Sequence, residues 1–214
     1  MISPLLKNET IDLSQNFDVP LEQLSIATNY NPTNIYYRNF LGIKTKKVVE
    51  NIDLDFTCFM FNEDQTLVDS IYSPKHKSWL IKNNFPLGKT TSNDGAIQYH
   101  DFESEPENTF KKAMTIDTKK INNEIDSIFF YLTFDLRKVK SPDFSAVKEL
   151  QMTFFGDKNL QKKVSEYNIT TEKSPSKNEG ILVLGKLVRK NGNWKFKTIG
   201  KTIEESDFIQ TKGI

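Results

Sequence analysis

The sequence contains a single cysteine, Cys58, among its 214 residues. One cysteine cannot form an intrachain disulfide, so the fold is held together without one, as is usual in a reducing compartment. The first residues also lack the basic stretch and the following apolar run of a signal peptide. We therefore expect a cytoplasmic protein.

The sequence also lacks an excess of either charge, because it has 29 Lys and Arg residues and 28 Asp and Glu residues. A net charge near zero gives no long-range attraction to nucleic acid or to an anionic membrane, and only a local patch of charge would bind either. We expect no nucleic-acid partner. No stretch approaches the roughly 20 apolar residues of a membrane helix, so we also expect no transmembrane segment.

Aromatic residues, in contrast, are common: the chain has 16 Phe, and 37% of it is hydrophobic. Such residues favour strands and are sufficient to fill a core. Apolar runs or period-two alternation between polar boundaries predict four strands. They are residues 52–61, 125–136, 144–155 and 181–189. Within the third segment, a helix is the alternative for residues 146–150.

The end of the chain carries the clearest turn signal. Asn191 and Gly192 separate the strand 181–189 from the alternating residues 194–199. Asn-Gly tolerates positive φ at both turn positions and is typical of a type I′ hairpin turn. Trp194 and Phe196 alternate with lysines, which predicts a strand with one buried and one solvated face. We expect both rings to anchor the core.

Several short strands separated by polar connections predict a mainly β fold, an antiparallel β-sandwich with long connecting loops. Residues 92–108 and 170–179 are the clearest of these connections, since the first is acidic and the second is rich in Ser, Thr, Lys and Glu. The length suits a single domain, residues 1–214.

Taken in order, these blocks resemble the TerD-type tellurium-resistance and stress-response family. The terminal hairpin carries most of the resemblance: residues 183–189 (VLGKLVR) and 192–200 (GNWKFKTIG) are similar to the family's "fGeLYR" and "G-x-WKF-x-aiG" elements. Residues 52–61 (IDLDFTCFMF) are similar to its acidic "FDLDAS" strand. Residues 94–101 stand where its acidic loop lies, in a reduced form.

The resemblance implies a β-sandwich that is not an enzyme, acts in the response to tellurite or other chemical stress, and binds calcium through the acidic strand and loop. Ca²⁺ takes about six to eight oxygen ligands, and two acids spaced two apart on a strand point to one face. The expected ligands are Asp53, Asp55, Asp94, Asp101, Glu103 and Glu107. The alternative is that these acids are simply solvated.

Compared with the family, residues 30–48 are an insertion that mixes aromatic side chains with a basic run. Long loops on rigid sandwiches often carry recognition. A second hypothesis is therefore a structural or adaptor protein that has lost the metal and acts through protein-protein contacts with a partner. The insertion packing on its own sandwich is the alternative to a partner contact.

No group of residues in the sequence predicts a catalytic site. Cys58 alternates with core residues and is expected to be a buried hydrophobe. His76 and His100 are far apart in the sequence and lack a zinc-ligand pattern. Residues 88–91 (GKTT) end like a Walker A loop, but the upstream glycine is absent. The sequence shows no coherent set of nucleophile, general base and oxyanion-binding residues, so we do not expect this protein to be an enzyme.

Overall fold

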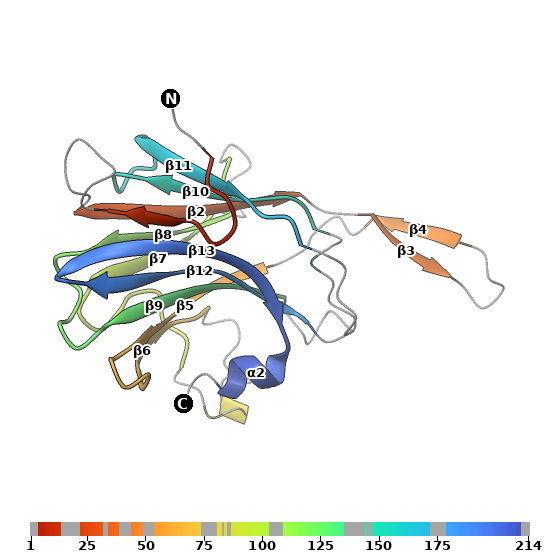
Figure 1. Ribbon diagram of the computed structural model, residues 1–214. Helices are drawn as coiled ribbons and strands as arrows, with labels where there is room; N and C mark the ends of the chain where they lie inside the picture. Colours follow the sequence, from red (N-terminus) through yellow and green to blue (C-terminus); the bar gives the residue numbers. More distant parts are fainter. Residues whose placement is uncertain are drawn as a thin grey trace.

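Two antiparallel sheets face each other in the computed structural model of the protein (Figure 1). The structure describes residues 4–13, 22–31, 34–38, 44–48, 54–73, 81–82, 84, 87–102, 109–134, 144, 147–171 and 179–210.

The larger sheet has six strands in the order β1-β13-β12-β9-β5-β6. Their bounds are Thr10–Asp12 (β1), Asn193–Ile203 (β13), Ile181–Lys190 (β12), Ser127–Phe134 (β9), Leu54–Phe61 (β5) and Leu67–Ile71 (β6). The smaller sheet has five strands in the order β11-β10-β2-β8-β7. Their bounds are Lys163–Asn168 (β11), Lys148–Phe155 (β10), Gln23–Asn31 (β2), Lys112–Asp117 (β8) and Ile97–Asp101 (β7). All neighbouring strands are antiparallel, so the predicted antiparallel β-sandwich is confirmed.

The four strands predicted from the sequence are present as β5, β9, β10 and β12. The helical alternative in the third segment is wrong, because β10 begins at Lys148 and runs through the apolar stretch that follows. The polar connection expected at residues 92–108 is wrong in part, because it contains β7. This strand escaped notice because its half-buried residues are mostly polar.

The terminal hairpin forms as predicted. Asn191 and Gly192 have φ values of 50° and 77°, and the register places Lys190 opposite Asn193, which is the geometry of a type I′ turn. Trp194 is 6% exposed and Phe196 is fully buried. Both are core anchors, as the alternation with lysines predicted.

Aromatic rings connect the two sheets through the core. In the larger sheet, the ring centroids of Phe56 and Phe130 are 6.1 Å apart, and those of Phe130 and Phe196 are 5.9 Å apart. Phe196 then meets Phe154 of the smaller sheet edge-on at 4.8 Å. All four rings are fully buried. Rings in this tilted or edge-to-face arrangement add to the stabilisation that comes from burying their area.

The short C-terminal helix α2 (Glu205–Gln210) covers the opposite, outer face of the larger sheet. Its Phe208 is fully buried, stacks on Phe59 of β5 at 4.9 Å and meets Tyr131 of β9 edge-on at 5.0 Å. The sheet is thus apolar on both faces near α2. No helix in the described ranges is long and apolar enough to cross a membrane.

Residues 30–48, interpreted as an insertion, fall into two parts. Tyr30 and Asn31 belong to β2, where Tyr30 is buried and Asn31 pairs with Lys148. Strands β3 (Asn34–Arg38) and β4 (Lys44–Val48) form a separate two-stranded sheet. This hairpin projects away from the sandwich (Figure 1).

Candidate functional site

Asp55 lies near the start of β5, the strand beside the edge strand β6 of the larger sheet, and is 1% exposed. It is opposite Thr133 of β9. Because side chains alternate along β5 and Phe56 faces the core, Asp55 faces the outer side of the sheet, as Phe59 does. A buried carboxylate is costly unless a cation or hydrogen bonds accompany it. Asp53, its expected companion, lies outside the described residues.

Two buried hydroxyl groups share this face with Asp55. Thr57 follows two residues later on the same strand, and Thr133 stands directly opposite Asp55. Within the described ranges, the Oγ1 atoms of Thr57 and Thr133 have no hydrogen-bond partner. Asp55 and Thr133 are directly opposed, which places their Cβ atoms about 5 Å apart. Thr57 is the next residue on the same face of β5, about 6.8 Å along the strand, so the three side chains form one polar patch. Oxygen donors of this kind are what Ca²⁺ accepts as ligands.

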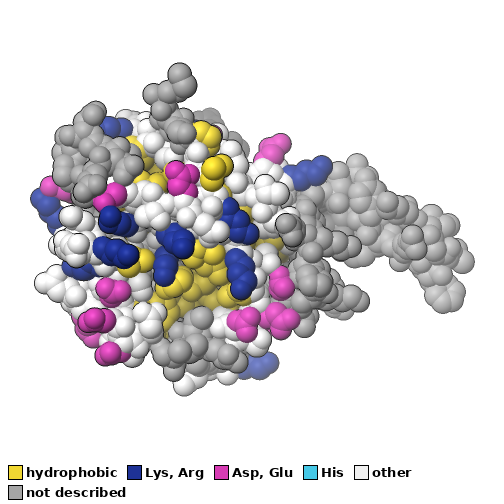
Figure 2. Space-filling model, viewed as in Figure 1, with side chains coloured by type: hydrophobic (Ala, Val, Ile, Leu, Met, Phe, Trp, Pro, Cys, Tyr) yellow, Lys and Arg dark blue, Asp and Glu magenta, His cyan; other side chains and the backbone are white. Residues whose placement is uncertain are grey.

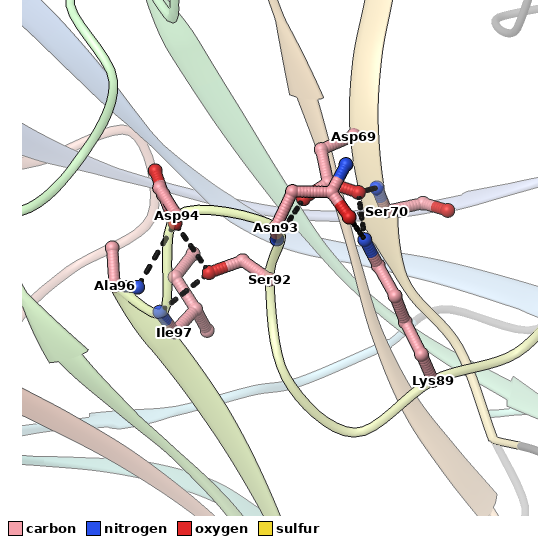
Figure 3. A network of polar contacts seen from close by, with 8 residues as sticks. All are labelled: Asp69, Ser70, Lys89, Ser92, Asn93, Asp94, Ala96 and Ile97. Carbon is pink, nitrogen blue, oxygen red and sulfur yellow. Dashed lines mark hydrogen bonds and ion pairs between the residues drawn. The ribbon is translucent and has the colours of Figure 1, made fainter.

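Asp94, one of the expected calcium ligands, accepts hydrogen bonds through both of its carboxylate oxygens. Its Oδ1 accepts hydrogen bonds from the Ser92 hydroxyl at 2.6 Å and from the Ala96 amide at 2.9 Å (Figure 3). Its Oδ2 accepts one from the Asn122 amide at 2.8 Å. The carboxylate thus closes the turn before β7 and joins it to a second loop.

These hydrogen bonds set the charge state of Asp94. Partial burial raises the pKa of its carboxyl group, but the hydrogen bonds from Ser92, Asn122 and Ala96 outweigh burial and hold the pKa below the ordinary value. Asp94 is therefore ionised at neutral pH, and both of its oxygens serve the turn.

Asp69 on β6 is the acid of this region that sequence reasoning missed. It is 8% exposed and forms an ion pair with Lys89 at 2.5 Å. Its Oδ2 also accepts a hydrogen bond from the Asn93 amide at 2.8 Å (Figure 3). Lys89 belongs to the GKTT sequence of residues 88–91, and its ion pair with Asp69 holds this loop in place. This structural role supports the interpretation that the similarity to a Walker A loop arose by chance. The signal was available, since Asp69 interrupts an apolar strand.

Asp101 lies at the far end of β7 from Asp94. Its Oδ2 is 3.4 Å from the ammonium group of Lys112, a side chain that is itself fully buried. Glu103 and Glu107 lie outside the described residues. Among the residues that the structure describes, no group of three or more His, Cys, Asp or Glu side chains is placed to hold a metal. The six-acid calcium site therefore remains a prediction, and its three described members lie in three different places.

Two residues that were considered and rejected as catalytic candidates, Cys58 and His100, are packed among other side chains of the fold. Cys58 is fully buried, and burial raises the pKa of its thiol well above the ordinary range. His100 is half-buried, stacks on Phe102 and lies 3.2 Å from the Thr115 hydroxyl. Desolvation lowers the pKa of His100, so its ring is neutral at pH 7. His76 lies outside the described residues.

Comparison with known sequences finds one family. The sequence profile of the TerD domain family matches residues 1–208. The chain is similar to the tellurium resistance protein TerD of Serratia marcescens, with 27% identity over 112 residues, or 52% of this chain and 56% of the relative. It is also similar to TerD of an Alcaligenes species, with 27% identity over 89 residues, 42% of this chain and 44% of that protein. The chain spans about half the length of these curated relatives.

Solved structures show the same fold. A homologue of the telluride resistance protein TerD from Streptomyces coelicolor A3(2) aligns with a TM-score of 0.56 and 11% identity, covering 88% of this chain and 95% of that one. A protein of unknown function aligns with a TM-score of 0.55 and 13% identity, with the same coverage. At these identities the likeness concerns the fold alone.

Proposed function

Because the chain belongs to the TerD domain family, we propose that it is a non-enzymatic, cytoplasmic stress-response protein of the tellurium-resistance type that binds calcium. Family membership supports the stress role. The acidic strand supports calcium, since β5 carries a carboxylate into a buried position on the sheet.

The observation that carries the calcium proposal is the polar patch on β5 and β9. A buried Asp55 and two buried hydroxyl oxygens, Thr57 Oγ1 and Thr133 Oγ1, lie on the outer face of the sheet, which also carries aromatic and aliphatic side chains. Calcium bound there would neutralise the carboxylate and supply the hydroxyl oxygens with a partner. Asp53 remains the first candidate for a second carboxylate ligand, whereas the carboxylate of Asp94 already accepts three hydrogen bonds.

Thermal unfolding with and without calcium tests this proposal. A ligand present at about 100 times its dissociation constant stabilises the native state by about 2.7 kcal/mol. Calcium should therefore raise the melting temperature of the wild type, and magnesium should raise it less because it demands a tighter octahedral shell. The Asp53→Asn, Asp55→Asn double variant should lose the shift and remain folded.

A matched control and the calcium-free state sharpen the experiment. Asp64→Asn removes an exposed acid from the turn after β5 and should leave the calcium shift intact. The calcium-free melting temperatures of the wild type and of the double variant provide the baseline from which each calcium shift is measured. An equal calcium shift in the wild type and in the double variant would overturn the assignment to β5.

A second candidate function is an adaptor that works through protein contacts without metal. The β3–β4 hairpin favours it, because it forms its own sheet and projects from the sandwich. The adaptor hypothesis takes precedence if the wild type shows neither a thermal shift nor bound metal at millimolar calcium. Capture of a partner that depends on residues 34–48 would then support it. A screen for turnover tests the expectation that neither form is an enzyme.

A further inference from the structure

The outer face of the β12–β13 hairpin carries a row of five lysines, which we call the lysine stripe. The register of the hairpin and the alternation of side chains place them on the side of the sheet away from the core. In Figure 2, Lys and Arg side chains form a band across the face on which β12 and β13 lie in Figure 1, with hydrophobic side chains beside the band. The stripe consists of Lys186, Lys190, Lys195, Lys197 and Lys201.

Among the residues that the structure describes, few ion pairs compensate the positive charge of the stripe. Lys186 and Lys197 are directly opposite each other on neighbouring strands, and like charges in that position destabilise a sheet. Within the described ranges, Lys195 is the one member of the stripe that forms an ion pair, with Asp12 of β1 at 2.7 Å. The fold thus concentrates repulsive charge on one face, although the net charge of the whole chain is only +1.

The shape of the stripe is a line and not a cluster. Lys195 and Lys197 occupy successive positions on one face of β13, which are about 6.8 Å apart, and Lys201 follows on that face after Ile199. Lys190 extends the line at the turn. Its length suits an extended polymer whose negative charges repeat at a similar distance.

The neighbours of the lysines distinguish between anionic polymers. Val188, Ile199 and Ile203 are half-buried on the same face, so part of the surface is aliphatic. The ring of Phe129, which a nucleobase would need for stacking, lies 5.1 Å beneath the ammonium group of Lys186. Peptides contain both carboxylates and aliphatic side chains, whereas a phosphodiester chain has only charge to offer here.

From this complementarity we infer that the lysine stripe docks an extended, acidic segment of a partner protein, with aliphatic residues among its Asp and Glu side chains. The inference does not depend on calcium. Its energy comes from exposed ion pairs, so the affinity falls as salt screens the charges.

The test uses the full chain in EDTA, so that it is independent of the calcium proposal. Fluorescence anisotropy measures binding of a labelled synthetic peptide of repeated Glu-Ser-Glu-Val, and a peptide with Gln in place of Glu is the control. The acidic peptide should bind and weaken with salt, and the Gln peptide should not bind. Lys197→Gln, Lys201→Gln should weaken binding about tenfold, since exposed pairs contribute a fraction of a kcal/mol each.

Matched variants separate docking from general charge and from stability. Lys158→Gln, Lys162→Gln removes two exposed lysines from the loop after β10 and should leave binding unchanged. Lys197→Arg, Lys201→Arg keeps the charge and should retain binding. Equal losses in the two Gln variants would overturn the inference, as would tight binding of a uridine oligonucleotide or of anionic lipid vesicles without binding of the acidic peptide.

Discussion

Two hairpins of this protein have the same local construction and different surroundings. In β12–β13, each strand has a second neighbour, because β9 pairs with β12 and β1 pairs with β13. In β3–β4, five residues pair with five, and neither strand has another partner in the described part of the chain. The comparison separates the contribution of strand pairing to stability from the contribution of side-chain burial.

Pairing alone stabilises a hairpin little, since an isolated two-stranded hairpin is marginally stable in water at best. The terminal hairpin places Trp194, Phe196 and Thr198 in buried positions on one side. Burial of such side chains is the main favourable term in folding. We therefore expect β12–β13 to support the sandwich, and β3–β4 to depend on it.

The largest expected effect is that of Trp194→Ala. The indole is 6% exposed, and the Arg189 guanidinium lies 4.7 Å from its ring centroid. Truncation leaves a cavity and removes this contact, so unfolding free energy should fall by about 3–5 kcal/mol. Chemical denaturation measures it. A loss well below 1 kcal/mol would mean that the ring contributes little to the core.

Gly192→Val should have the next largest effect. Gly192 has φ of 77°, and an added Cβ would meet no atom within 4 Å, so any loss comes from backbone conformation and not from a clash. A β-branched residue resists this region, and we expect a loss of about 1–2 kcal/mol. Gly192→Asn is the control and should lose less, because Asn tolerates positive φ. Equal melting temperatures for Gly192→Val and the wild type would contradict the turn assignment.

Asp94→Asn tests the contribution of the Asp94 carboxylate to the turn before β7. The variant replaces an acceptor of the Asn122 hydrogen bond, and we expect a loss of about 1–2 kcal/mol at pH 7. Because the folded pKa of Asp94 is below its ordinary value of 3.8, its contribution is present above pH 3.8 and is lost as pH falls through the folded pKa. The difference between the wild type and the variant should therefore shrink in acid. A constant difference from pH 7 to pH 2 would contradict this account.

Replacement of residues 34–48 by a short Gly-Ser linker should have the smallest effect. The exchange leaves Tyr30 and Asn31 in β2, where they contact the sandwich. The unfolding free energy should stay within about 0.5 kcal/mol of the wild type. If the exchanged protein is instead unfolded, the hairpin contributes to the core, and the adaptor hypothesis loses its structural support.

The predictable part of the fold was the part with strong patterns. β5, β9, β12 and the terminal hairpin combine aromatic or branched residues with clear boundaries. β2 has no such pattern, because Ser25, Ala27 and Thr28 are buried among its apolar residues. Other segments of the protein cover these small and polar side chains of β2. The local periodicity of the sequence gives no sign of such burial.

The candidate site was less predictable than the fold. Spacing placed Asp53 and Asp55 on one face of a strand, and the buried position of Asp55 agrees with the strand assignment. Spacing did not reveal that Asp94 accepts hydrogen bonds from residues before and after it in the chain. It also gave no reason to connect Asp69 with Lys89, since that ion pair forms only when β6 and the loop before β7 come together.

The most direct test of the calcium proposal is a metal analysis of the purified protein after dialysis against millimolar calcium, with the Asp53→Asn, Asp55→Asn variant treated in parallel. We predict bound calcium in stoichiometric amount in the wild type and a marked loss in the variant. Wild-type protein without bound calcium, or a variant with as much calcium as the wild type, would contradict a calcium site on β5.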